Sequence, residues 1–155
     1  MLTAWIERLR PDASEALLLA ARAHHLRRWE SPRDGYPQGR RGYLRWRREL
    51  QRLHATYAGE ILEDVGYDAE SIGAVERLIR KETARDDPEG QAFEDGLTLV
   101  FIETQLHDLA ARADSTTMER VLRRTWRKIS PAARAIALQA DLAPEDRKLL
   151  ERAIG

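Results

Sequence analysis

The sequence contains no cysteine, which excludes a disulfide framework and a thiolate metal site. No apolar run approaches the roughly 18 residues that a membrane-spanning helix needs. The opening residues, MLTAWIERLRPD, lack the charged and then apolar pattern of a secretory signal. No Gly-x-Ser-x-Gly turn, phosphate-binding loop or dinucleotide-binding glycine pattern is present. We therefore expect a soluble, cytoplasmic protein that does not associate with a membrane.

Strand-like alternation of polar and apolar residues is also lacking, whereas helical spacing recurs nearly everywhere. The pattern predicts a single all-α domain over residues 1–155, built from about seven to eight helices. Asp12 is the expected N-cap of the second helix, and Trp46, Leu50 and Ile61 are expected on the buried face of the third. The expected helices cover about 2–9, 12–29, 41–64, the segment after Asp68, 87–112, 116–129, 131–140 and 144–153.

Charge is unevenly distributed, although the net charge is zero. Residues 22–52 contain ten basic and three acidic residues, a local balance of +7, and the rest of the chain has the opposite balance of −7. This split favours an anion-binding region on an acidic body. It argues against a general nucleic-acid-binding domain, because such domains are usually basic throughout.

Prolines and glycines between residues 32 and 42 predict a loop long enough to suggest ligand binding. Arg40 and Arg41 open the next helix, where free backbone N–H groups attract anions. Arg47 and His54 lie two turns apart on one side of that helix, with Tyr43 one turn nearer the loop. Arginine forks suit phosphate and aromatic rings stack on bases, so we expect a phosphorylated small molecule, a nucleotide above all. The alternative is that the arginines pair with the acidic excess and the aromatics belong to the core.

Three residues outside this loop could hold a metal ion. His25 lies near the end of the second helix, and His54 follows Leu50 by one turn, beside the buried face. Asp95 shares the apolar stripe of the fifth helix with Leu99, where a carboxylate needs a cation or a donor. Imidazole and carboxylate ligands on separate helices suit a divalent metal. The alternative is that the histidines are hydrogen-bonded core residues and that Asp95 pairs with an arginine.

The basic stretch resembles the signature of DUF4202, a family named as a domain of unknown function. The matching residues are Arg27 to Glu30, Pro32-Arg33, Tyr36-Pro37, Arg40 or Arg41, and Gly42 to Arg47. The similarity continues through His54, Gly66-Tyr67, Lys81, Glu94-Asp95 and Thr125 to Lys128. Family members begin earlier, so this chain is expected to lack the family's N-terminal segment.

That family in turn resembles the HD-domain proteins, a helical superfamily of metal-dependent phosphohydrolases. The run from Leu19 to His25 is similar to the helix that carries the His-Asp pair of the superfamily, and His54 is similar to its next histidine. Lys81 stands where many members have another histidine, and Glu94-Asp95 resembles the final acidic ligand. The resemblance implies one divalent metal (Mn, Fe, Zn or Mg) held by His25, His54 and Asp95. It also implies that Glu94 and Asp95 serve catalysis and that Lys81 adds a cation.

We therefore expect an HD-like protein that binds a divalent metal and a phosphorylated small molecule, which it could hydrolyse. The expected ligand-binding residues are Arg28, Arg33, Arg40, Arg41, Tyr43, Arg47 and Lys81. The alternative is a non-catalytic helical module that has lost the metal and binds an anion or an RNA segment through the same residues. A third interpretation is a structural protein whose basic region docks on an acidic partner.

Overall fold

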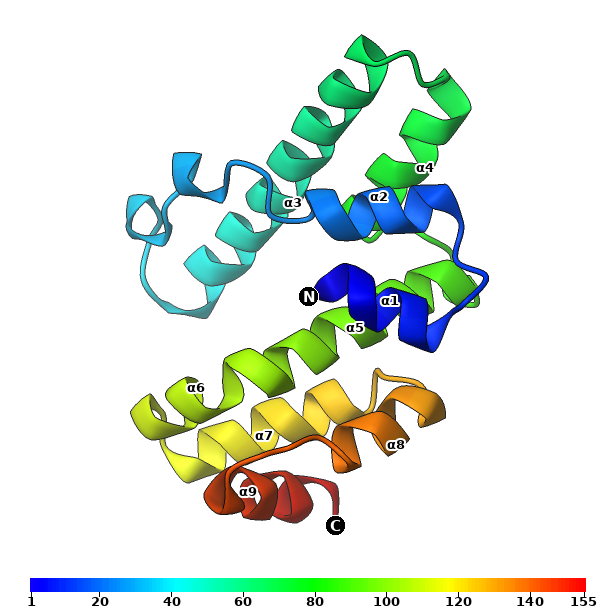
Figure 1. Ribbon diagram of the computed structural model, residues 1–155. Coiled ribbons are helices and arrows are strands. Elements are labelled where there is room, and N and C mark those ends of the chain that lie inside the picture. The colour runs from blue at the N-terminus through cyan, green and yellow to red at the C-terminus, as the bar shows by residue number, and fades with distance from the viewer. The chain divides into compact units, whose positions relative to one another are not determined.

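Nine α-helices and two short 3₁₀ helices make up the computed structural model, which describes residues 1–155 and has no strand (Figure 1). The all-α prediction is confirmed, with somewhat more helices than expected. Contacts divide the chain into two compact units: unit 1 is residues 1–11 and 91–155, and unit 2 is residues 12–90. The expectation of one domain over residues 1–155 stays a prediction.

Unit 1 contains five helices besides the greater part of α5. In this unit α7 packs against α9, and α6 contacts both. Gly96 of α5 lets α1 approach closely, because a Cβ atom there would lie 2.8 Å from Leu2 Cδ1 and 3.0 Å from Ile6 Cδ1. The helices are α1 (Leu2–Leu9), α5 (Pro88–Thr104), α6 (Leu106–Arg112), α7 (Ser115–Trp126), α8 (Pro131–Leu138) and α9 (Pro144–Ile154). The core includes Leu99, Ile102, Leu106, Met118, Leu122, Leu149 and Leu150.

The predicted helix over residues 87–112 is interrupted in the structure. It divides at Gln105 into α5 and α6, so the prediction of one continuous helix is wrong. The start of α7 is capped by Asp114, whose Oδ1 accepts a hydrogen bond from Thr117 N at 2.9 Å. Ser130 caps α8, with its Oγ accepting a hydrogen bond from Ala133 N at 3.2 Å.

Unit 2 contains three α-helices and both 3₁₀ helices. Its central element is α4, which packs against α3 and against α2. The approach of α4 to α3 is close at Gly59, where a Cβ atom would lie 2.8 Å from Glu76 Oε1. The elements are α2 (Glu15–Ala23), η1 (Arg28–Glu30), η2 (Arg33–Gly35), α3 (Gly39–Asp64) and α4 (Ala69–Arg80). Buried residues include Leu17, Ala20, Leu50, Ala55, Ala58, Leu62, Val75, Leu78 and Ile79.

The N-cap of α2 differs from the prediction. Ser14, and not Asp12, caps the helix, because its Oγ accepts a hydrogen bond from Leu17 N at 3.1 Å. Glu89 fixes Ser14 in turn: its carboxylate accepts from Ser14 N at 2.8 Å and from Ser14 Oγ at 2.7 Å. The start of α2 is therefore tied to the start of α5 within unit 2.

Two further predictions about unit 2 are wrong. The helix α2 ends at Ala23 instead of continuing to Trp29, which lies in η1 with 76% of its surface exposed. The buried face of α3 includes Trp46 and Leu50 as predicted, but the prediction for Ile61 is wrong: it is 45% exposed, while Leu62 beside it is buried. The helix α3 packs closely against α4 at Gly59. This side of α3 is buried because a small residue allows the close approach, which a larger side chain would prevent.

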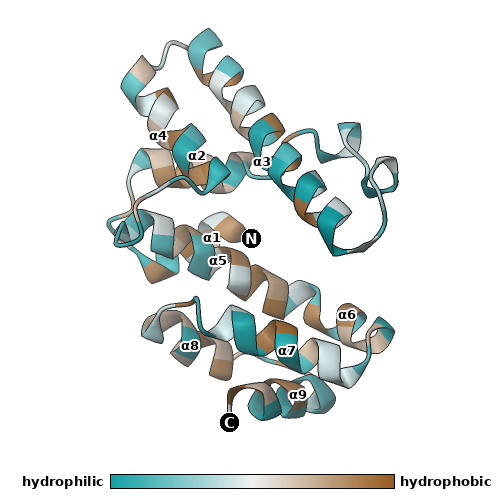
Figure 2. Ribbon diagram, turned by 180° about the vertical axis from the view of Figure 1, so that it is seen from behind, coloured by the Kyte–Doolittle hydropathy of each residue, from teal (hydrophilic) through white to brown (hydrophobic).

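The polarity of the helices follows their packing. Figure 2 shows the first half of α3 largely in teal, in keeping with its arginines, and α5 largely in brown and pale shades. None of the helices combines the length and the apolar character that crossing a bilayer requires.

Candidate anion-binding site

Three imidazole rings meet in unit 2, where the chain leaves α2 and passes α3. His24 is the C-cap of α2, His25 follows it, and His54 lies in the middle of α3. The ring centroids of His24 and His25 are 3.9 Å apart, and those of His25 and His54 are 6.0 Å apart. We call these three residues the histidine cluster. It brings together His25 and His54, two of the candidate metal ligands of the sequence analysis.

The proton of His54 is fixed by a backbone carbonyl. Its Nδ1 lies 2.6 Å from Leu26 O, so Nδ1 carries the hydrogen and Nε2 is left with a lone pair. His54 is only 3% exposed, and its Nε2 is buried with no hydrogen-bond partner. A buried acceptor of this kind lowers the free energy of unfolding by about 1–3 kcal/mol if it has no hydrogen-bond partner. It is therefore suited to accept a ligand hydrogen or to coordinate a metal.

Arg28 lies beside the histidine cluster, with its Nη1 3.5 Å from His25 Nε2. Burial is the main cause that lowers the pKa of all three histidines, and that of His25 falls to about 3. The positive charge of Arg28 adds to the effect on each ring, Arg47 acts on His25 and His54, and Lys81 acts on His24. The rings are therefore neutral at pH 7, and the charge of the site comes from two arginines and a lysine.

Trp46 supports the arginines of the loop. It is buried, and its Nε1 donates a hydrogen bond to Ser31 O at 2.9 Å. The guanidinium carbon of Arg28 lies 5.1 Å from the centroid of the Trp46 ring, and that of Arg33 lies 6.0 Å from it. These stacking contacts hold planar cations near the start of α3.

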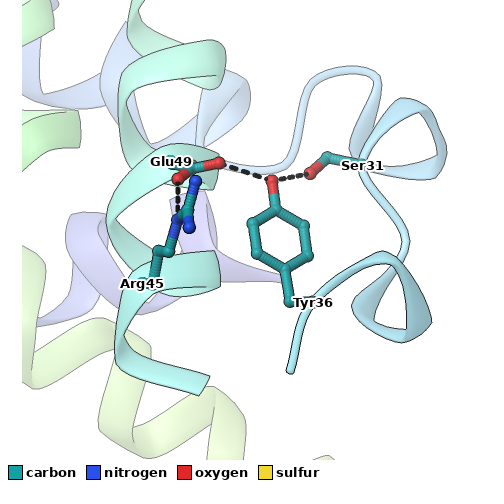
Figure 3. A network of polar contacts seen from close by, with 4 residues as sticks. All are labelled: Ser31, Tyr36, Arg45 and Glu49. Atoms are coloured by element: carbon teal, nitrogen blue, oxygen red, sulfur yellow. Dashed lines mark hydrogen bonds and ion pairs between the residues drawn. The ribbon is translucent and has the colours of Figure 1, made fainter. Parts of the chain in front are cut away.

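A polar network attaches the loop to α3 (Figure 3). The hydroxyl of Tyr36 donates to Glu49 Oε2 at 2.7 Å and lies 3.0 Å from Ser31 Oγ. Arg45 Nε donates to Glu49 Oε1 at 2.8 Å and completes the network. Arg33 adds two bonds of 3.0 Å to the carbonyls of residues 36 and 37, so its guanidinium already holds the loop.

The remaining arginine candidates lie apart from the histidine cluster. Arg40 and Arg41 are exposed in the first turn of α3, and neither is among the charges that act on the three rings. Tyr43 is also exposed, and its ring centroid lies 5.8 Å from that of Trp46. The structure thus places Arg28 beside His25, while Arg47 and Lys81 contribute positive charge that lowers the pKa of one or more of the rings. Ligand binding by the other candidates stays a prediction.

Asp95 belongs to unit 1, where it is 3% exposed. Its Oδ1 accepts hydrogen bonds from Gln91 Nε2 at 2.8 Å and from Ser130 N at 2.9 Å, so this buried carboxylate is matched by amide donors. Neither unit contains a group of three or more His, Cys, Asp or Glu side chains placed to hold a metal. Glu94, also in α5, is half-buried. The metal and catalytic roles of Asp95 and Glu94 stay predictions.

A basic depression on unit 2 was not expected from the sequence. It has a volume of about 440 Å³ and is open to solvent. The part of its lining that comes from α3 could have been predicted from the sequence, because Arg48, Gln51 and Arg52 are spaced to lie on one side of this helix. The lining residues are Arg48, Gln51, Arg52, Arg80, Lys81 and Glu82.

The fold defines an all-α protein, in which three histidine rings lie together between α2 and α3. Residues 1–150 match the family model described as Domain of unknown function (DUF4202), and the chain belongs to this family. No curated protein and no solved structure matches the chain.

Proposed function

We propose that the protein binds a phosphate-bearing small molecule, with a nucleotide as the expected ligand, at the histidine cluster. The observation that carries the proposal is the geometry of the site: Arg28 Nη1 lies 3.5 Å from His25 Nε2, and the buried Nε2 of His54 has no hydrogen-bond partner. A phosphate brings the negative charge that the guanidinium of Arg28 can bind.

The chemistry of the individual groups suits such a ligand. Arginine forks bind two phosphate oxygens at once, and Arg28 is already oriented by its stacking on Trp46. The lone pair of His54 Nε2 accepts a hydrogen, which a ribose hydroxyl or a singly protonated phosphate supplies. A ligand with both an anionic and a hydroxyl group satisfies the site better than a simple anion.

The test is titration of adenosine monophosphate into the protein and into the Arg47→Ala variant by calorimetry. We expect Arg47→Ala to weaken binding by about tenfold, since a charge-assisted contact contributes roughly 1.4 kcal/mol or more. Arg22→Ala is the matched control: Arg22 is an exposed arginine at the end of α2, and its loss should change the affinity by less than about twofold. Equal affinities for all three proteins would refute the proposal.

A second candidate function adds a divalent metal and phosphohydrolase activity to the same site. Support comes from His54, whose Nδ1–H donates to a carbonyl while Nε2 stays unpaired, as is usual for a metal-ligating histidine. The resemblance of His25 and His54 to the histidines of HD-domain proteins points the same way. The cations near the rings would oppose a lone divalent ion, so a metal is expected to bind together with the anion.

Elemental analysis separates the two candidates, with His54→Asn as the variant. The asparagine amide can still donate to Leu26 O, but it has no atom in the place of Nε2. If the metal function holds, the protein supplied with Mn, Fe, Zn and Mg in the presence of phosphate retains near-stoichiometric metal and His54→Asn does not. Metal in neither protein leaves the non-catalytic anion-binding module. Affinity for RNA that rises with oligonucleotide length and falls steeply with salt would assign the same cations to RNA instead.

A further inference from the structure

We infer that His107 and Asp146 form a pH-sensitive tie, which fastens the start of α9 to the start of α6 most firmly while His107 carries a positive charge. Both residues belong to unit 1, whereas the histidine cluster belongs to unit 2. The inference therefore goes beyond the proposed function and does not depend on it.

The two side chains come together from the first turns of their helices. His107 follows Leu106, the first residue of α6, and Asp146 lies in the first turn of α9. The Nδ1 of His107 lies 3.0 Å from Asp146 Oδ2, within hydrogen-bond distance. The side chain of Asp146 is only 6% exposed, whereas that of His107 is 63% exposed. A buried carboxylate needs a donor, and here the donor is a ring that exchanges its proton with the solvent.

Negative groups lie around His107 on both helices. Glu145 Oε1 of α9 is 3.9 Å from the same Nδ1, and Asp108 follows His107 in α6. The hydrogen bond to Asp146, together with the negative charges of these carboxylates, raises the pKa of His107 above its ordinary value of 6.5. The other three histidines of the chain have a lowered pKa, with burial as the main cause. His107 is thus the histidine that loses its proton above pH 6.5.

The protonated form of His107 stabilises the folded chain. Its pKa is higher in the folded chain than in the unfolded chain, where it has the ordinary value of 6.5. The stabilisation is therefore complete below pH 6.5 and is lost as the pH rises through the pKa of the folded state. The neutral ring can still donate its Nδ1–H to Asp146, so the tie weakens but does not have to break.

Other contacts of α9 depend on arginine, which stays charged across the neutral range. Arg147 donates to two carbonyls just before α9, at 3.0 and 2.7 Å. The helix α7 contacts both α6 and α9, and its charges are directed at α9: Glu119 lies 3.2 Å from Arg152, and Arg123 donates to a carbonyl of α9 at 3.2 Å. Among these contacts, the pair of His107 and Asp146 is the one that a histidine proton controls.

NMR titration of the imidazole signals is the first test, with the signal of His107 assigned by its loss in His107→Asn. We expect His107 to titrate with a midpoint above 6.5 and the other three histidines below it. The midpoint of His107 should fall in Asp146→Asn, which removes the charge of the partner. A midpoint at or below 6.5 for His107 in the unaltered protein would overturn the inference.

Thermal unfolding at about pH 6 and about pH 8 measures what the tie contributes. The variant is His107→Asn, whose amide can still donate to Asp146 but carries no charge. We expect the Tm of the unaltered protein to fall further between the two pH values than that of His107→Asn. The matched control is Arg147→Ala, which loses contacts at the same helix start but should keep the pH dependence of the unaltered protein. The same pH dependence with and without His107 would refute the tie.

Discussion

Replacing Asp95 by alanine is expected to lower the free energy of unfolding by about 2–3 kcal/mol. The carboxylate Oδ1 accepts from Gln91 Nε2 at 2.8 Å and from Ser130 N at 2.9 Å. Gln91 has a second acceptor in Lys128 O at 3.0 Å, but the N–H of Ser130, at the N-cap of α8, would lose its bond to Asp95. Urea unfolding followed by circular dichroism measures the effect.

Asp95→Asn is the control for this prediction. Asparagine keeps an oxygen in the place of Oδ1 and removes only the charge, so we expect a loss below about 1 kcal/mol. A loss of less than about 0.5 kcal/mol in Asp95→Ala would show that these bonds do not stabilise the start of α8. The same Asn variant tests the predicted metal role, since a metal ligand would lose affinity for metal while the fold stays intact.

Replacing Gly42 by alanine is expected to destabilise unit 2 by about 2 kcal/mol or more. A Cβ atom at this position would lie 1.8 Å from Pro37 O and 2.6 Å from Pro37 C, and backbone atoms cannot rotate away as a side chain can. The loop must therefore move, and the bond between Tyr36 and Glu49 would be strained with it. Unfolding by urea gives the energy, and the fluorescence of the buried Trp46 reports the loop.

Gly35→Ala provides the comparison within the same loop. A Cβ atom at Gly35 has no heavy atom within 4 Å, and its φ is not in the left-handed region. We expect a change of less than about 0.5 kcal/mol and an unaltered tryptophan spectrum. If the two alanine variants behave alike, the close approach of Pro37 to α3 does not determine how the loop is held.

Helix starts could be predicted from the sequence where local chemistry determines them. Ser130 with the following proline and Asp68 both act as caps in the structure. Ends set by distant residues could not be predicted. After the end of α2 the chain turns at Arg27, which has φ of 49° and whose guanidinium lies 4.6 Å from the ring of Tyr57, thirty positions further along the chain.

The candidate site shows the same division. Helical spacing predicted that His54 would lie beside the buried face, and it is buried. The spacing could not show that His54 Nδ1 donates a hydrogen bond to Leu26 O. Nor could it show that the guanidinium of Arg33 donates to two carbonyls of the loop. The bond from Ser130 N to Asp95 likewise joins residues far apart in the sequence. The burial of a polar side chain can be predicted from helical periodicity. Its hydrogen-bond partner cannot, because tertiary packing determines which groups come close to it.

The order in which the chain is synthesised acts differently on the two units. Unit 2 is one continuous segment, residues 12–90, whereas unit 1 joins residues 1–11 to residues 91–155. All residues of unit 2 therefore leave the ribosome before the second segment of unit 1 does, and its helices can pair as they emerge. The helix α1 is made before unit 2, whereas its partner α5 is completed only after it. Until then the buried residues Leu2 and Ile6 are without the surface at Gly96 that covers them in the native protein.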